Sequence, residues 1–175
     1  YFMTLEDKNQ NDILQSEIID SYSIDYIFSD KPINRFKTKP KVEERSKLLD
    51  DLRDQIKNIE NCKLKNNSSK LVFNDGNYQS KIMIVGEGPG QKEDEVGKPF
   101  VGDAGILLNK MLKAINIERN NIYITNVVNY RPPNNRKPEP DEITRYSNFL
   151  RKHISIIDPK ILILMGSTAM ESLFG

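Results

Sequence analysis

The stretch Lys81-Ile82-Met83-Ile84-Val85-Gly86-Glu87-Gly88-Pro89-Gly90 places a short, continuous apolar run directly before a glycine-rich loop. Such a run, without polar alternation, is typical of a strand that is buried in a parallel sheet. Residues 122–128 and 161–166 form two further runs of this kind. Apolar residues recur at helical spacing in the intervening segments, residues 104–116 and 140–157. This order of strands and helices predicts an α/β fold with a parallel sheet that helices cover on both faces.

Amphipathic patterns indicate where the helices and the domain boundary lie. In the helix predicted at 104–116, one face carries Leu108, Met111, Leu112 and Ile115. A further helical period begins near residue 42 and continues to about residue 60. Residues 1–41 are polar, and we expect them to form a partly flexible N-terminal extension. The predicted domain therefore covers residues 42–175.

Composition limits the classes of protein to which this chain can belong. Its 175 residues suit one domain, and 37% apolar with 29% charged residues is typical of a globular protein. A net charge of +1 argues against a strongly basic protein that coats nucleic acid, but it does not exclude a local basic patch. A single cysteine, Cys62, points to a reducing compartment. Because no bilayer-length apolar run or signal peptide is present, we expect a cytoplasmic protein with no membrane partner.

The loop after the first predicted strand could carry chemistry, because ligands bind beyond the carboxyl ends of strands in open parallel sheets. The three glycines and one proline of Gly86–Gly90 let the backbone approach a ligand closely. The carboxylates of Glu87 and Glu93 could orient water or stabilise a developing cation. The alternative is a tight turn with solvated acids. The spacing fits neither the dinucleotide-binding loop nor the Walker A loop, which disfavours a small nucleotide-binding domain.

An aromatic ring and a carboxamide follow along the chain. Phe100 lies in a loop rich in glycine, where its ring would either fill the core or stack on a planar ligand. Asn126 lies near the end of the second strand, where its carboxamide would either cap the strand or pair with an amide-like edge such as that of uracil. The only histidine, His153, falls inside the last long helix, and we expect it to be structural or solvated.

A basic loop stiffened by proline occupies residues 131–138. Its prolines reduce the entropy that is lost when the loop orders against a partner. Arginine and asparagine side chains suit contacts with phosphate, and Arg131, Asn135 and Arg136 are the candidates. The alternative is a solvated basic turn.

Three motifs together resemble those of the family 4 uracil-DNA glycosylases, and also those of related proteins described as phage DNA polymerases. The motifs lie at residues 85–94, 97–108 and 123–138, in matching order and spacing, and the resemblance covers roughly residues 43–175. It implies a three-layer α/β/α sandwich that hydrolyses the N-glycosidic bond of deoxyuridine in DNA. Uracil-containing DNA would be the partner, the base would be flipped into a pocket, and we expect a monomer.

The resemblance also implies roles for individual residues. Phe100 would stack on uracil, and Asn126 would bind the amide edge of the base. Glu87 and Glu93 would be the catalytic acids, positioning water or stabilising an oxocarbenium-like sugar. The residues lining the base and sugar would be Gly86, Gly88, Pro89 and Gly90, and those near the DNA would be Arg131, Asn135 and Arg136.

Two departures from the family pattern change these expectations. Typical members hold a 4Fe-4S cluster with four cysteines, but here Cys62 alone matches, and Ile59, Tyr130 and Tyr146 stand at the other positions. Because one thiolate cannot hold a cluster that needs about four, we expect no metal, no cofactor, and tyrosine packing in its place.

The second departure concerns the end of the family pattern. That pattern continues with a fourth strand and a His-Pro motif whose histidine supports the leaving uracil, and we find no counterpart in these 175 residues. We therefore expect three of the four family strands and a poor glycosylase when the 175 residues act alone. The alternative is a non-catalytic or decayed remnant that binds DNA.

Overall fold

The computed structural model describes residues 42–174, and the extension predicted at residues 1–41 lies outside the described residues. The helices and strands follow in the order α2 (Val42–Lys57), α3 (Lys63–Asn67), β1 (Asp75–Gly76), β2 (Ile82–Gly86), α4 (Gln91–Val96), α5 (Asp103–Ala114), η2 (Arg119–Asn121), β3 (Tyr123–Asn126), η3 (Pro133–Asn135), α6 (Pro140–Ile157), β4 (Ile161–Leu164) and α7 (Ser167–Phe174).

The sheet contains the three parallel strands that the sequence predicts. Its order is β1-β3-β2-β4, with β2 central and parallel to both β3 and β4. The two-residue strand β1 pairs antiparallel with β3, and the sequence pattern gave no sign of it. The parallel register places Gly86 opposite Asn126, so the loops that follow β2 and β3 begin side by side.

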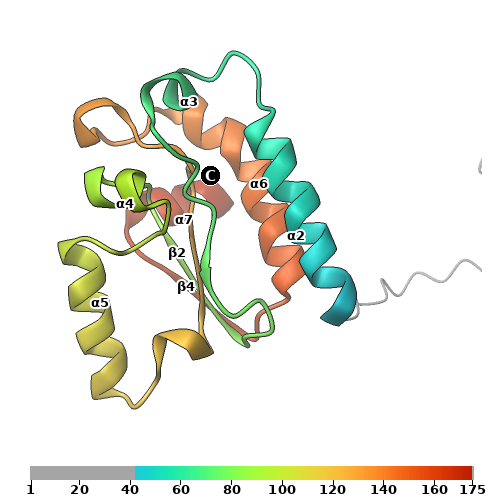
Figure 1. Ribbon diagram of the computed structural model, residues 1–175, viewed down its shortest axis with the longest axis vertical. Coiled ribbons are helices and arrows are strands. Elements are labelled where there is room, and N and C mark those ends of the chain that lie inside the picture. Colours follow the sequence, from blue (N-terminus) through green and yellow to red (C-terminus); the bar gives the residue numbers. More distant parts are fainter. Residues whose placement is uncertain (1–41, 175) are drawn as a thin grey trace, which may run out of the picture. The chain divides into compact units, whose positions relative to one another are not determined.

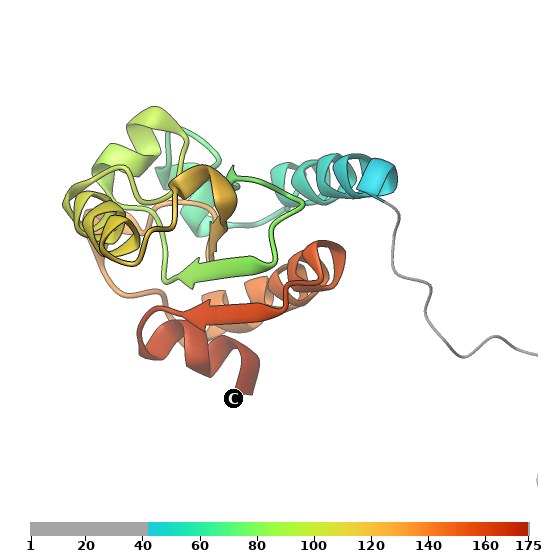
Figure 2. The same ribbon diagram turned by 90° about the horizontal axis from the view of Figure 1, so that it is seen from below.

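Helices cover both faces of the sheet, which confirms the predicted α/β/α layering. Figure 1 shows α2 and α6 together on one side of the sheet and α5 on the other, and Figure 2 shows the same layers from below. α6 begins at Pro140, where the ring of proline suits the first turn, and the side chain of Glu142 accepts a hydrogen bond from the Glu139 amide in a capping box. α7 packs against α6.

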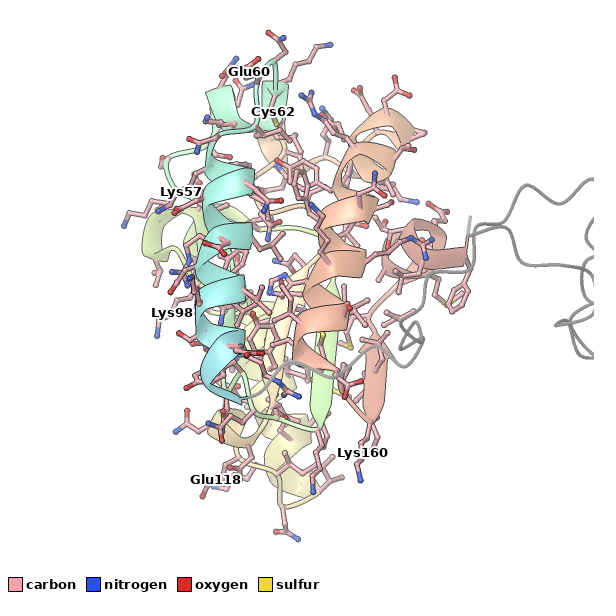
Figure 3. The ribbon with its side chains drawn as sticks, turned by 90° about the vertical axis from the view of Figure 1, so that its right-hand side faces the viewer. Lys57, Glu60, Cys62, Lys98, Glu118 and Lys160 are labelled. Carbon is pink, nitrogen blue, oxygen red and sulfur yellow. The ribbon has the colours of Figure 1, made fainter. Side chains whose placement is uncertain are left out.

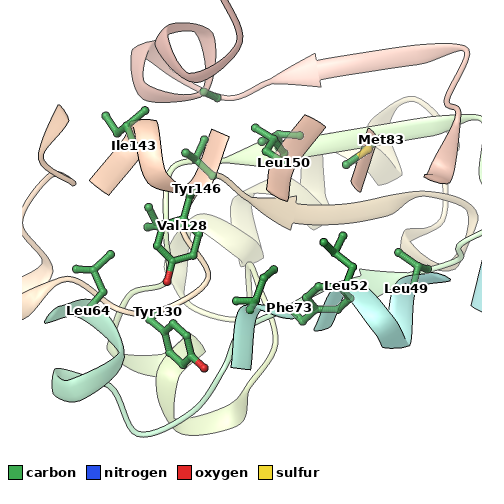
Figure 4. Packing of buried hydrophobic residues seen from close by; sticks show 14 of the residues in the cluster. Leu49, Leu52, Leu64, Phe73, Met83, Val128, Tyr130, Ile143, Tyr146 and Leu150 are labelled. Carbon is green, nitrogen blue, oxygen red and sulfur yellow. The ribbon is translucent and has the colours of Figure 1, made fainter. Parts of the chain in front are cut away.

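The larger of two cores lies between the sheet and the layer of α2 and α6. Figure 4 shows Leu49, Leu52 and Met83 toward one end of this core, and Tyr130 and Tyr146 toward the other. All five side chains are buried. Figure 3 shows α2 and α6 side by side over this core.

The smaller core lies between the sheet and α5. Leu108 and Leu112 of α5 pack there against Ile84, Ile122 and Ile124. The apolar face predicted for this helix is wider than the face that is buried. Met111 is 54% exposed and Ile115 is 63% exposed, because the helix contacts the sheet along one narrow stripe.

The prediction that the third strand is buried is wrong on one of its two faces. β4 lies at the edge of the sheet, and its side chains alternate between the two faces. Leu162 and Leu164 pack against the larger core, whereas Ile161 is 53% exposed and Ile163 is 39% exposed. The uniform apolar run gave no hint of this asymmetry.

Candidate active site

Gly86, Phe100 and Asn126 meet at the carboxyl ends of β2 and β3. A Cβ atom at position 86 would lie 2.5 Å from Asn126 Oδ1 and 2.6 Å from Phe100 Cζ. Any side chain at this position would therefore occupy the space where the aromatic ring and the carboxamide come together. Glycine is needed here for close approach, and not for an unusual backbone conformation.

The carboxamide of Asn126 faces a pocket instead of the protein backbone. The residue is only 3% exposed, yet no residue within 42–174 hydrogen-bonds to its side chain. It also lines the pocket described below. Its donor and acceptor are thus available for a ligand, which is unusual for a buried amide.

Glu93 holds the backbone of two loops together. Its Oε2 accepts a hydrogen bond from the Gly90 amide at 3.1 Å. Its Oε1 accepts from the Val101 amide at 2.9 Å and from the Gly102 amide at 2.7 Å. The carboxylate that the sequence suggested as a catalytic acid therefore joins the glycine-rich loop to the loop that carries Phe100.

Glu87 is the more exposed of the two acids, and a residue of α7 orients it. Thr168 Oγ1 donates a hydrogen bond to Glu87 Oε2 at 2.5 Å. Thr168 is 1% exposed, so its hydroxyl is well fixed. No motif in the sequence pointed to Thr168 as part of the site. β4 lies beside β2 in the sheet, so the residues that follow these two strands are close together. This strand order is the signal that would have indicated a residue after β4 as a neighbour of Glu87.

A pocket of about 670 Å³ brings most of the predicted site residues together. Its volume is within the range of small-ligand sites. Of the predicted residues, Pro89, Arg131 and Arg136 are not part of the lining. The lining residues are Gly86, Glu87, Gly88, Gly90, Gln91, Lys92, Glu93, Glu95, Phe100, Gly102, Asp103, Ala104, Asn126, Asn135 and Met165.

The basic loop reaches the pocket through Asn135 alone. Asn135 Oδ1 accepts a hydrogen bond from Arg131 Nε at 2.7 Å, which links the two residues. Arg136 instead forms two hydrogen bonds with the carboxylate of Glu142, both 2.8 Å long. The hydrogen bond from Glu142 raises the pKa of Arg136, and the same bond holds the pKa of Glu142 below its usual value although burial opposes this.

Cys62 lies beside two tyrosines in the larger core. Its Sγ atom is 3.4 Å from the hydroxyl of Tyr146. Burial and the contact with Cys62 raise the pKa of Tyr146, and burial with the nearby Cys62 also raises the pKa of Tyr130. Both phenols therefore keep their protons at neutral pH. Figure 3 labels Cys62 at the end of the domain opposite Lys160, the residue that precedes β4.

Two further features of the described residues bear on function. Within residues 42–174, no group of three or more histidine, cysteine, aspartate or glutamate side chains is arranged to hold a metal ion. None of the helices in this part of the chain is long and apolar enough to cross a membrane.

Comparison with known proteins identifies the family. The profile of the Uracil DNA glycosylase superfamily matches residues 73–175. The type-4 uracil-DNA glycosylase of Thermotoga maritima is 42% identical over 127 residues, which are 73% of this chain and 66% of that protein. That of Sulfurisphaera tokodaii is 44% identical over 127 residues, 72% of this chain and 58% of that protein. A DNA polymerase of Bacillus phage SP01 is 34% identical over 111 residues, 63% of this chain and 12% of that protein.

The fold and these similarities define the class to which this α/β protein belongs. The chain belongs to the uracil DNA glycosylase superfamily. It matches 58–66% of the length of the two type-4 relatives named above.

Proposed function

We propose that this protein removes uracil from DNA by hydrolysing the N-glycosidic bond of deoxyuridine. The observation that carries the proposal is the meeting of the Phe100 ring and the Asn126 carboxamide over Gly86, inside one pocket. An aromatic face and an amide without a protein partner suit a flat base with an amide edge. The names of the type-4 relatives add independent support for uracil in DNA as the substrate.

In this proposal the flipped base stacks on Phe100 and its amide edge pairs with Asn126. The backbone of Gly86, Gly88, Pro89 and Gly90 borders the base and the sugar. In the hydrolysis, the oxygen of water bonds to the sugar C1′ while the C1′–N1 bond breaks, and the electron pair of the C1′–N1 bond leaves with uracil. The water loses one proton and the uracil anion takes one up, so the products are a C1′ hydroxyl and free uracil.

Of the two acids, Glu87 is the better candidate to orient the water or to stabilise positive charge on the sugar. Its carboxylate lines the pocket, is exposed, and accepts a hydrogen bond from Thr168 that orients it. Both oxygens of Glu93 accept hydrogen bonds from backbone amides, so this acid acts through the loops that it holds. A carboxylate near C1′ stabilises positive charge that develops there in the transition state.

DNA contacts are proposed for Arg131, Asn135 and Arg136. Asn135 lies at the pocket and holds Arg131 through the hydrogen bond between their side chains, which supports a joint contact with phosphate beside the flipped nucleotide. Arg136 would have to exchange its contacts with Glu142 for such a contact, so its contribution to DNA binding should be the smallest of the three.

We propose that the protein holds no iron–sulfur cluster. The residues at the family's cluster positions supply one thiol, which contacts the Tyr146 hydroxyl, and two phenols that keep their protons. This donor set does not fit a cluster that needs about four thiolates. The side chains pack against one another instead, and Cys62, Tyr130 and Tyr146 are all buried. We further propose a monomer that acts in the cytoplasm, in keeping with the single cysteine.

The experiment is a single-turnover excision assay with the full-length protein and a labelled single-stranded oligonucleotide that contains one deoxyuridine. Heating in alkali cleaves the strand at any abasic site. We expect cleavage with the wild type, and a rate lower by about 10- to 100-fold for Phe100→Ala and for Asn126→Ala, because each removes one contact with the base.

Asn148→Ala is the matched control for Asn126→Ala, since Asn148 is an exposed asparagine on α6. It should leave the rate unchanged. DNA binding without any excision by the wild type would favour the alternative of a non-catalytic remnant. Equal rates for Asn126→Ala and Asn148→Ala would remove the role proposed for the pocket.

A further inference from the structure

Phe100 has a backbone conformation that its surroundings must stabilise. Its φ angle is 53°, in the left-handed region that residues other than glycine rarely adopt. Gly105 in the first turns of α5 lies directly against it, since a Cβ atom at position 105 would be 1.9 Å from the Phe100 carbonyl oxygen. The loop that carries the aromatic ring is therefore strained and tightly packed, and other groups must hold it.

Arg119 holds the carbonyl groups of this loop. Its Nη2 donates to the Pro99 carbonyl oxygen at 2.7 Å, and its Nη1 donates to the Phe100 carbonyl oxygen at 3.1 Å. Nη1 also donates to Asn109 Oδ1 of α5 at 3.0 Å. A planar guanidinium can make these contacts together because its donors point in fixed directions.

The peptide group between Phe100 and Val101 is held at both ends. Arg119 binds its carbonyl oxygen, and Glu93 Oε1 accepts from its N–H, which belongs to Val101. The preceding peptide group is bound by Arg119 through the Pro99 carbonyl oxygen. The peptide planes on both sides of Phe100 are thus fixed, and with them the direction in which the ring leaves the backbone.

Asp75 connects Arg119 to the sheet. Its Oδ2 accepts a hydrogen bond from Arg119 Nε at 2.7 Å, and both side chains are only 20% exposed. Asp75 lies in β1, which pairs with β3, the strand that ends in Asn126. The two binding groups of the pocket are therefore anchored to the same strand, β3. Asn126 belongs to it, and the loop of Phe100 is connected to it through Arg119 and Asp75.

We propose that Arg119, oriented by Asp75, is a positioning residue that sets the Phe100 ring against the base in the pocket. Arg119 does not line the pocket and acts through the backbone of the Phe100 loop. This inference rests on the proposed function, because it assigns the part that Arg119 plays in binding a flipped uracil. Misplacing the ring should impair the reacting geometry although every group that touches the base is still present.

The test is a double-mutant cycle measured by single-turnover excision with the full-length protein. Arg119→Met should slow excision by about 10- to 100-fold in the wild-type background. In the Phe100→Ala background the same change should have less than about a twofold effect, because no ring remains to be positioned. Arg119→Lys should recover only part of the rate, since one ammonium group cannot span both carbonyls and Asp75.

Arg145→Met is the matched control. Arg145 also binds two successive backbone carbonyls, those of Glu60 and Asn61, but these lie between α2 and α3, in a loop that does not line the pocket. It should leave the rate unchanged. An equal loss from Arg119→Met in both backgrounds, no loss at all, or the same loss from Arg145→Met would overturn the proposal.

Hydrogen exchange separates this inference from the proposed function. The Val101 and Gly102 amides should exchange faster in Arg119→Met than in the wild type, while the amides of β3 should not change. If the wild type excises no uracil, the proposed function fails and the exchange still tests the positioning role. Unchanged exchange at Val101 and Gly102 would overturn that role whether or not the protein excises uracil. Asp75→Asn leaves Arg119 in place but weakens its orientation, so it should also increase the exchange rates of the Val101 and Gly102 amides. This variant provides the test if Arg119→Met does not fold.

Discussion

At the scale of single residues, the pocket depends on the absence of a side chain at position 86. The sequence showed a glycine-rich loop, but such loops have many uses. The contacts that require glycine come from Phe100 and Asn126, which lie 14 and 40 positions further along the chain. Only the packing of the Phe100 loop onto the end of β2 reveals that their side chains meet there.

Gly86→Ala should reduce uracil excision by about tenfold or more. The new methyl group would lie 2.5 Å from Asn126 Oδ1 and 2.6 Å from Phe100 Cζ, so it would push the two binding groups apart. Inserting a methyl group into a packed site costs about 1–3 kcal/mol. Single-turnover rates and thermal unfolding of the same samples would check this. A variant that keeps the wild-type rate would show that the ring and the carboxamide do not act together.

Thr168→Val should slow excision while Thr168→Ser should not. Valine keeps the shape of threonine but removes the hydroxyl that donates to Glu87 Oε2, and serine keeps the donor. Hydrogen bonds to charged groups contribute about 1.5–3 kcal/mol, so we expect a loss of about 10- to 100-fold for valine. The rates of the two variants at saturating enzyme measure this. If both variants lose the same activity, the hydroxyl does not orient Glu87.

At the scale of elements, the sequence pattern predicted the three parallel strands and the long helices. It was less informative about which of their faces other elements bury. The apolar run at 161–166 looked like the runs of the inner strands, yet β4 is an edge strand with Ile161 and Ile163 exposed. The spacing of apolar residues shows which face of a helix or strand is apolar. Whether another element covers that face depends on the topology of the fold. The helix α4 and the strand β1 were missed because they are too short to show any period.

His153 of α6 should make stability depend on pH. Its ring stacks on Phe73 with centroids 4.6 Å apart, and Nε2 lies 2.5 Å from the hydroxyl of Tyr123. Burial, together with the charge of Arg53, lowers the pKa of His153 to about 3. In the unfolded chain the pKa is about 6.5. The unfolded state therefore binds a proton first, and stability that is complete above about pH 6.5 is lost as the pH falls toward 3.

Urea unfolding at pH 7.5 and pH 5 tests this dependence. The free energy of unfolding should be lower at pH 5 by about 2 kcal/mol. Because His153 is the only histidine, most of the change in this range should disappear in His153→Phe. Equal stability of the wild type at the two pH values would contradict the buried, neutral histidine.

At the scale of the whole molecule, the resemblance of three motifs to a family was enough to predict the fold class and the family, and the superfamily match confirms both. The resemblance also implied that Phe100 and Asn126 contact the same base, and both line the pocket, but it did not show which residues of the basic loop would reach that pocket. Arg131, Asn135 and Arg136 look equivalent in the basic loop, but only Asn135 reaches the pocket, because Arg136 pairs with Glu142. Which of these side chains reaches the pocket depends on the hydrogen-bond partner that each one has in the folded protein, and the sequence pattern does not show that partner.

The purified protein should be colourless and should lack iron and acid-labile sulfide. Cys62 is the only cysteine, and the Tyr146 hydroxyl lies against its sulfur. Anaerobic purification followed by iron and sulfide analysis checks this, with Ile59→Cys/Tyr130→Cys/Tyr146→Cys as a comparison that supplies four thiols. Stoichiometric iron and sulfide in the wild type would refute the tyrosine-packed core.

The most direct test of the central claim is to identify the products formed from a single-stranded oligonucleotide with one deoxyuridine. The full-length protein should release one free uracil for each abasic strand, as measured by mass spectrometry of both products, and Asn126→Ala should release far less under the same conditions. A matched oligonucleotide with thymine at the same position should stay intact. Uracil that remains attached to the strand, at enzyme concentrations that saturate DNA binding, would contradict the account.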